Sequence, residues 1–561
     1  MPREIDRQLY ASLYGPTTGD RVRLADTNLL AEVEHDYTSY GDELLVGFGK
    51  SIREGMLATG RAGNDSKLDM LVANAVVMDP VLGIFKGNIG IKEGRIVGIG
   101  RAGNPDVVDD VDLVVGTNTS IVTAEGLIAT PGGIDPHVHL ASTSLHSAAL
   151  SSGLTTLVGM GSGGVWDVGV NPAYNFDRLL EAFEGIPLNV ALLGRGSAVH
   201  RSALERTVAI GCAGLKIHED VGAYPAVIDA CLGVADELGV AVALHTDSLN
   251  ESAQIQETVA AIGGRTIHAY HVEGAGGGHP DLLELVSHGH ILTSSTTPTI
   301  PYTVSTAPEH FDMIMVVHRM SYRLEEDRRA TEARVRAATI AAESVLHDQG
   351  AIAMMSSDSQ GMGRIGEVIR RTWQLAHRMK EVFGAEGPND NARILRYLAK
   401  YTLNPAVTHG LANEIGSLEP GKLADVVLWR PEFFGVKPQL VLKSGFVSWA
   451  PVGDGNGSTR ICEPQIYRPM YGGLGAAPAS LNVNFVSQLG LDSGLAKRLG
   501  TRRRLVSVGP TRQLTKGDMR HNSACPTVAV ASDGSAVTID GRPVELEPAT
   551  SLPLSQLYFL R

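Results

Sequence analysis

Short apolar runs alternate with longer amphipathic stretches through the middle of the chain. The stretches between the runs repeat apolar residues at helical spacing, as in "FDRLLEAFEGI" and "PAVIDACLGVADELG". Strand–helix alternation repeated eight times predicts an α/β fold, a (β/α)₈ TIM-type barrel whose functional residues lie at the C-terminal ends of its strands. The predicted barrel strands are residues 127–135, 154–160, 188–194, 214–220, 240–247, 266–274, 290–296 and 350–358.

One connection in this pattern is much longer than the others. Residues 297–349, between the seventh and eighth strands, contain two helical stretches, "EHFDMIMVVHRMSYRL" and "DRRATEARVRAATIAAESVLHD". Long insertions at the mouth of a barrel often act as lids over the chemistry. We therefore expect a flap here.

A second pattern, of alternating apolar and polar residues, flanks the barrel on both sides. It begins near residue 65 with "DMLVANAVVMD" and "GNIGIKEGRIVGIG", and it returns in "GKLADVVLWRPEFF" and "PQLVLKSGFVSWA". We expect the two regions to form one composite β-rich domain. The predicted organisation is 1–126 and 421–480 for the β-rich domain, 127–420 for the barrel, and 481–561 for a C-terminal segment that packs back on the barrel.

Composition and charge narrow the class of protein. Hydrophobic residues make up 43% of the chain, and the net charge of −13 argues against nucleic acid or anionic membrane as the main partner. The four cysteines, 212, 231, 462 and 525, lack zinc-ribbon or redox spacing, which predicts reduced thiols. The N-terminus lacks an apolar signal region, and no window reaches the ~18 apolar residues of a membrane span. We expect a cytoplasmic protein.

Histidines and acidic residues gather at the predicted strand ends. A single histidine there is more often an ordinary buried or hydrogen-bonded residue, and we interpret His146, His268, His288 and His290 in this way. Five at successive strand ends, with a terminal aspartate, are too many for that explanation and exceed the needs of one four-coordinate zinc. They predict two metal ions about 3.5–4 Å apart. The candidate residues are His137, His139, His218, His245, His271, Asp220 and Asp358.

Lys216 is an unexpected neighbour for a metal site. In "AGLKIHED", side chains that alternate along a strand would place Lys216, His218 and Asp220 on one face. Burial near cations lowers a lysine's pKa, and the neutral amine can then add CO₂ to form a carbamate. A carbamate is a carboxylate in charge and shape. Lys216 would therefore serve as the anion that bridges two metals.

Several longer motifs resemble one family closely. The chain is similar to the large (alpha) subunit of urease, within the amidohydrolase superfamily. The H-x-H pair and the aspartate of the eighth strand are superfamily-level features. More specific to urease are "LYGPTTGDRVRLADT", "GLKIHED", "ALHTDSLNES", "TIHAYHVEGAGGGH", "SSDSQGMGR", "RYLAKYTLNPAVTHG" and "FFGVKP", which extend over nearly the whole chain.

The resemblance implies a dinuclear nickel centre that hydrolyses urea to ammonia and carbamate. His137, His139 and Asp358 would bind one nickel, His245 and His271 the other, and carbamylated Lys216 would bridge both. The ligand types alone would equally allow zinc. A metal-activated hydroxide would attack the urea carbon. The remaining roles are substrate binding by His218, Gly276 and Gly361, general acid catalysis by the flap residue His318, and positioning of that histidine by Asp220 and Arg334.

The departures from the family pattern surround the substrate, not the metals. Val317 stands where a flap cysteine is usual, Arg319 where a second histidine is usual, and Val221 where a tryptophan is usual. Gly361 replaces an alanine. The loop "GSGGVWDVGVNPAYN", around Trp166, is about four residues shorter than in the family. An alternative is therefore a related dinuclear amidohydrolase that acts on a substituted urea, a guanidine-like compound or another small amide.

A third alternative is a non-catalytic subunit that has kept the fold for assembly, although the complete ligand set argues against it. The chain begins almost directly at the alpha-subunit motif. The resemblance therefore implies separate beta and gamma subunits, assembled as a trimer of heterotrimers. It also implies accessory proteins that load nickel and CO₂.

Overall fold

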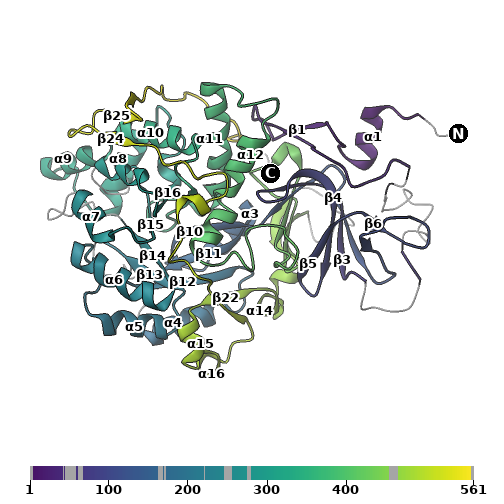
Figure 1. Cartoon of the computed structure of the whole chain (residues 1–561), viewed down its shortest axis with the longest axis horizontal. Helices are drawn as coiled ribbons and strands as arrows, with labels where there is room; N and C mark the ends of the chain where they lie inside the picture. The colour runs from purple at the N-terminus through teal and green to yellow at the C-terminus, as the bar shows by residue number, and fades with distance from the viewer. Residues whose placement is uncertain are drawn as a thin grey trace.

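A barrel and a β-rich sheet make up most of the molecule. In a computed structural model of the full chain, the described residues are 4–41, 43, 58–60, 67–161, 169, 172–219, 221–245, 255–274, 280–453 and 465–556. Figure 1 shows the barrel, in teal, beside a sheet that combines purple N-terminal strands with light-green strands from after the barrel.

The barrel consists of eight parallel strands in sequence order, as predicted. The first and last strands meet through a bridge between Val138 and Ser359, and the His139 N–H donates to the Ser359 carbonyl at 2.9 Å. Their C-terminal ends therefore lie at one mouth. The strands are β10 (Gly133–His139), β11 (Leu154–Met160), β12 (Asn189–Arg195), β13 (Gly214–Ile217), β14 (Ala241–Leu244), β15 (Ile267–Ala269), β16 (Ile291–Thr296) and β17 (Met354–Ser356).

Helices connect these strands and cover the barrel. α6 (Pro225–Leu238) illustrates why they form: Pro225 occupies the first turn, and Gly239 ends the helix in a left-handed conformation while its N–H donates to the Ala235 carbonyl. The other connecting helices are α3 (Leu145–Ser152), α4 (Ala173–Ala182), α5 (Arg201–Ala209), α7 (Ile255–Ile262), η1 (Pro280–Ser287), η2 (Thr297–Thr299), η3 (Ile365–Glu367), α11 (Val368–Phe383), α12 (Asn391–Ala399) and α13 (Leu403–Thr408).

The long insertion contains three α-helices, where the sequence predicted two helical stretches. α8 (Thr306–Val317) is followed by α9 (Glu325–Arg334) and α10 (Ala337–Asp348). The predicted second stretch is broken because Val335 and Arg336 have extended backbone angles. α10 is almost wholly buried against the barrel, so α8 and α9 alone form the part that resembles a flap.

The first predicted barrel strand is in fact two strands in different sheets. β9 (Ile128–Pro131) pairs with β3 and β18, whereas β10 begins the barrel. Gly132 lies between them, where a Cβ atom would come within 2.2 Å of the Thr155 hydroxyl. The nine-stranded sheet contains β3 (Met70–Asp79), β4 (Gly83–Lys92), β5 (Arg95–Gly100), β8 (Ser120–Thr123), β9, β18 (Val426–Trp429), β19 (Leu440–Lys443), β20 (Phe446–Val452) and β21 (Ile466–Pro469).

A buried ion pair joins this sheet to the barrel. Lys443 and Asp425 are both buried, and their side chains are bonded to each other. The Lys443 Nζ also donates to the Thr155 carbonyl of β11 at 3.1 Å, and the Asn189 amide of β12 donates to Asp425 at 2.7 Å. Both charges are therefore satisfied across the junction, which fixes the sheet against the barrel.

The C-terminal segment returns to the barrel. β22 (Val483–Val486) pairs in parallel with β12, and β23 (Arg504–Ser507) pairs with β22. The small sheet of β24 (Val528–Val530), β25 (Val537–Ile539) and β26 (Arg542–Pro543) packs on η1. The remaining elements are β6 (Ala102–Gly103), β7 (Leu113–Val114), η4 (Pro431–Phe433), η5 (Tyr471–Gly473), α14 (Ala477–Leu481), α15 (Gln488–Asp492), α16 (Leu495–Leu499) and η6 (Lys516–Asp518).

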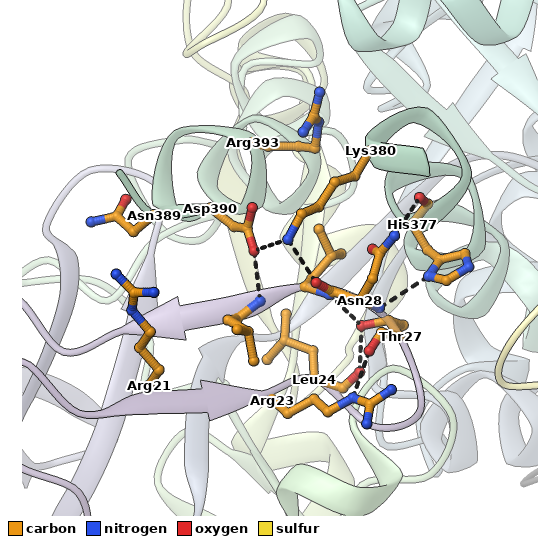
Figure 2. Close-up of polar contacts among 12 residues, drawn as sticks. Arg21, Arg23, Leu24, Thr27, Asn28, His377, Lys380, Asn389, Asp390 and Arg393 are labelled. Carbon is orange, nitrogen blue, oxygen red and sulfur yellow. Dashed lines mark hydrogen bonds and ion pairs between the residues drawn. The ribbon is translucent and has the colours of Figure 1, made fainter. Parts of the chain in front are cut away.

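The N-terminal hairpin is held by polar contacts to barrel helices. α1 (Arg7–Tyr14) leads into β1 (Arg21–Arg23) and β2 (Leu30–Glu32). Figure 2 shows how the hairpin turn meets α11 and the start of α12. The Lys380 Nζ donates to the Asn28 carbonyl and to Asp390, each at 2.7 Å, and the Asn28 N–H donates to His377 Nδ1 at 3.0 Å. Asp390 also accepts the Leu30 N–H, so the turn and the start of β2 are both anchored to the barrel helices.

Two expectations from composition can be compared with the described residues. Cys212, Cys231 and Cys525 are free thiols, whereas Cys462 lies outside the described residues. Within the described part of the chain, each helix is too short or too polar to cross a membrane.

Candidate metal centre

The candidate ligands converge at the C-terminal mouth of the barrel. His137 and His139 lie within β10 instead of after it, because this strand continues further than predicted. Asp358 follows β17 in a left-handed backbone conformation (φ 58°), which is uncommon for a residue with a side chain. Its N–H donates to the His137 carbonyl at 3.0 Å, which fixes the turn beside β10. Asp358 Oδ1 then lies 3.3 Å from His137 Nε2 and 3.1 Å from His139 Nε2.

A second group of ligands forms around the next strands. His245 directly follows β14, and His271 follows β15 with a φ of 31°. His271 Nε2 lies 2.9 Å from His245 Nδ1. Potential ligand atoms of His137, His245 and His271 lie within 4.8 Å of one another, as do those of His137, His139 and Asp358. The two groups share His137, so two adjacent cations could be held.

Lys216 lies among these groups, on β13. Its side chain is 0% exposed, and its Nζ lies 3.6 Å from the centre of the Tyr270 ring. Within the described part of the structure, this Nζ has no hydrogen-bond partner. Burial lowers the pKa of Lys216 well below its ordinary value, and the negative charges of Asp358 and Glu219 oppose that effect only in part. The neutral amine that a carbamate requires is thus favoured.

The donor atoms fit metal cations. Among the described residues, both ring nitrogens of His137, the Nδ1 of His271 and the Oδ1 of Asp358 lack hydrogen-bond partners although they are buried. Burial lowers the pKa of His137 and of His245, and it lowers that of His271 to about 4, so the rings are neutral and have a lone pair available. Buried polar atoms without partners are costly, and cations would satisfy them.

His218 and Gly361 border the ligand groups. The His218 ring stacks on that of His245, with centroids 4.0 Å apart and an angle of 23°. Burial lowers the pKa of His218, which favours its neutral form. A Cβ atom on Gly361 would come within 2.7 Å of Asp358 Oδ1 and 2.9 Å of His139 Cδ2. Glycine at this position therefore allows the backbone to approach the Asp358 and His139 side chains closely.

The insertion contributes His318 and Arg334. His318 caps the C-terminus of α8 and is half-buried, and its Nδ1 lies 3.1 Å from the Ile314 carbonyl. The pKa of His245 is lowered mainly by burial, and the charge of His318 is one of the smaller contributions in the same direction. Arg334, the last residue of α9, is buried; burial lowers its pKa, and the carboxylate of Glu219 opposes that effect.

Two family models and a curated relative match most of this chain. The family model for the amidohydrolase family matches residues 128–460, and the one for the N-terminal domain of the urease alpha-subunit matches residues 3–122. A curated protein from Streptomyces coelicolor, "Urease subunit alpha 2", is 50% identical over 558 residues, which cover 99% of this chain and 100% of the relative. The chain belongs to the urease alpha-subunit family.

Solved structures similar to this urease alpha-family chain are more distant. A D-hydantoinase has a TM-score of 0.49 and 16% identity, and the match covers 68% of this chain and 95% of that chain. A dihydropyrimidinase from Brevibacillus agri has a TM-score of 0.48 and 14% identity, with 68% and 94% covered.

Some candidate residues of this family member are not described. Asp220, Gly276 and the shortened loop around Trp166 lie outside the described residues. Of the residues that depart from the family pattern, Val221 is 42% exposed and Val317 is half-buried at the end of α8.

The structure also reveals two site residues that the sequence did not suggest. β13 ends at Ile217, three residues before the predicted end of the strand, and Glu219 is brought to the site. Its Oε1 lies 3.3 Å from His245 Nε2. Tyr270 was not among the candidate residues, yet it contacts Lys216 and His137. Glu219 could have been suggested by its place between the candidate residues His218 and Asp220. The sequence contained no comparable indication for Tyr270.

Proposed function

We propose that this chain is the catalytic subunit of a urease, which hydrolyses urea to ammonia and carbamate. The observation that carries the proposal is the pair of ligand groups that share His137 around the buried Lys216. The 50% identity to a urease alpha subunit supports urea as the substrate.

Two nickel ions would be held by the residues of the two groups. His137, His139 and Asp358 would bind one, His245 and His271 the other, and a CO₂-derived carbamate on Lys216 would bridge them. Imidazole nitrogens and carboxylate oxygens suit nickel. When bound, such a pair of cations would polarise the urea carbonyl and provide hydroxide at neutral pH.

The chain's own residues would orient the substrate. A neutral His218 can donate one ring N–H to the urea carbonyl oxygen, and its stacking on His245 holds that ring beside the ligands. Gly361 would leave space for an amide group next to Asp358 and His139. We also assign a substrate contact to Gly276 on the basis of the family motif.

The departing nitrogen must receive a proton, because an amide anion is a very poor leaving group. His318 would donate it from the end of α8 when the flap closes and excludes water. Arg334 at the end of α9 would position His318, together with Asp220. The burial of Arg334 supports this role, since a buried guanidinium holds a fixed geometry.

The family also suggests an assembly. We infer separate beta and gamma subunits in a trimer of heterotrimers, nickel-loading accessory proteins, and a place in the cytoplasm.

The experiment that tests the function measures two quantities on one sample. The chain is co-expressed with its neighbouring genes in medium with nickel, and ammonia release from urea and metal per chain are determined together. We expect two nickel ions per chain and urea turnover. In the matched variant His318→Asn, turnover should fall at least 100-fold while the metal count stays the same.

Two other results would overturn the proposal. Two metals per chain without urea turnover would favour another amide substrate, and substituted ureas would then be assayed. Equal turnover in His318→Asn would exclude its role as the general acid.

A further inference from the structure

Tyr270 lies inside the barrel directly before the candidate ligand His271. It is 0% exposed and packs in a core cluster with Ile134, Val158 and Met160. In this position a tyrosine could simply fill space. Its polar atoms and ring, however, each contact a segment that carries a candidate ligand.

The backbone and the hydroxyl of Tyr270 connect three ligand-bearing segments. Its N–H donates to the Leu244 carbonyl at 3.0 Å, and His245 follows Leu244 in the chain. Its hydroxyl donates to the Pro136 carbonyl at 2.8 Å, and His137 follows Pro136. Tyr270, which itself precedes His271, thus holds the backbone directly before His245 and the backbone directly before His137.

The ring of Tyr270 contacts two site residues. Its centroid lies 3.8 Å from that of His137, at an interplanar angle of 17°, and the Lys216 Nζ lies 3.6 Å from it. The ring is held in turn by His268, which meets it edge-on at 4.5 Å. His268 is itself fixed by contacts to His409 at 3.1 Å and to Ser294 at 2.9 Å. The Tyr270 ring that contacts Lys216 and His137 is therefore fixed on its other side by His268.

Packing alone does not account for the hydroxyl. A phenylalanine would fill the same volume, whereas a buried hydroxyl loses its hydration and must recover that loss through a hydrogen bond. The bond to Pro136 has ideal length, and its acceptor lies next to the histidine shared by both ligand groups. Its effect is to fix the backbone that carries His137.

We propose that Tyr270 is a positioning residue of the metal centre. Its hydroxyl fixes the position of the backbone before His137 relative to β14 and β15. Its ring fixes the orientation of the His137 ring and the position of the Lys216 Nζ. This inference rests on the proposed function, because it assumes that these residues hold metal. Residues that orient metal ligands typically change metal affinity by about 10- to 100-fold.

The test measures how fast metal leaves the protein. The full-length chain is purified with nickel bound, and nickel release to an excess of a coloured chelator is followed at 25 °C. Tyr270→Phe removes only the hydroxyl, and Tyr270→Leu also removes the ring. Tyr397→Phe is the matched control, because Tyr397 is equally buried and its hydroxyl donates to Asp348 at 3.1 Å, away from the site.

We expect release about tenfold faster in Tyr270→Phe, about 100-fold faster in Tyr270→Leu, and unchanged in Tyr397→Phe. The melting temperature of the metal-free protein is measured in parallel. A packing residue would lower that temperature without changing release from the folded protein.

Three results are distinguishable. Wild-type release rates in both Tyr270 variants would overturn the inference and leave the proposed function intact. Equal acceleration in Tyr397→Phe would also overturn it, because the effect would then follow from lost stability. A wild-type protein without two metals per chain would overturn the proposed function itself. If Tyr270→Leu fails to fold, Tyr270→Phe still decides the question.

Discussion

Replacing Glu219 with glutamine tests whether a carboxylate sets the orientation of His245. Glu219 Oε1 lies 3.3 Å from His245 Nε2, and the Glu219 side chain is only 1% exposed. A carboxylate accepts from a ring N–H and never donates, so it places the hydrogen on Nε2 and leaves the lone pair on Nδ1, the atom that faces His271. Glutamine has the same shape but can also donate, so this preference is lost.

The magnitude follows from the kind of bond. Hydrogen bonds to charged groups contribute about 1.5–3 kcal/mol, and each 1.4 kcal/mol corresponds to roughly a factor of ten. We therefore expect Glu219→Gln to weaken metal binding about 10- to 100-fold. The Glu219 charge also partly opposes the effect of burial, which lowers the pKa of Arg334 at the end of α9.

Metal affinity of the full-length chain would be measured by competition with a chelator of known affinity, for nickel and for zinc. The control is Glu381→Gln, because Glu381 Oε1 lies 3.1 Å from His377 Nε2 in a more exposed pair on α11, and His377 contacts the N-terminal hairpin through Asn28. Wild-type affinity in Glu219→Gln, or an equal loss in Glu381→Gln, would refute the reasoning.

Three further predictions concern buried ionisable groups. Lys216→Met should reduce bound nickel from two to less than one per chain, as counted by elemental analysis, because the bridging anion cannot form; a full metal count would contradict this. Lys443→Met should lower the free energy of unfolding by about 3–5 kcal/mol in guanidinium titrations, because Asp425 stays buried without its cation; Ser444→Ala, next to it, serves as the control, and an equal loss there would argue against the ion pair. Burial lowers the pKa of His409 to about 3, so the stability that depends on its neutral form is complete above pH 6.5 and lost progressively as pH falls toward 3. Between pH 6.5 and 3, the metal-free His409→Asn variant should therefore lose up to about 4 kcal/mol less unfolding free energy than the metal-free wild type. Equal losses in the two proteins would contradict this prediction.

The barrel could be predicted because its strands are buried on both sides and read as continuous apolar runs. β11 agrees at both ends with the predicted residues 154–160. The candidate ligands could also be predicted from the sequence, since histidines such as His137 and His139 are uncommon at strand ends. Family motifs then assigned individual roles, and those roles remain predictions.

What the sequence could not give depends on contacts between distant segments. The strand splits at Gly132, where a Cβ atom would meet the Thr155 side chain of the next strand. The break at Val335 and Arg336 contains no glycine or proline, so helix propensity gave no signal. Tyr270 acts through a hydroxyl bond to Pro136, a partner 134 residues away that only the closed barrel brings near.

The distance along the chain between the candidate ligands has a consequence for when metal could be loaded. Asp358 lies about 220 residues after His137 in the chain, although the bridge between Val138 and Ser359 joins the two segments in the closed barrel. At about 5–20 residues per second, a ribosome needs roughly 10–45 s to make that segment. During this time the two histidines of β10 emerge without the carboxylate that completes their group. If the two groups hold metal as proposed, an ion that arrives in this interval would meet only half of the group, and correct loading would have to follow the synthesis of Asp358.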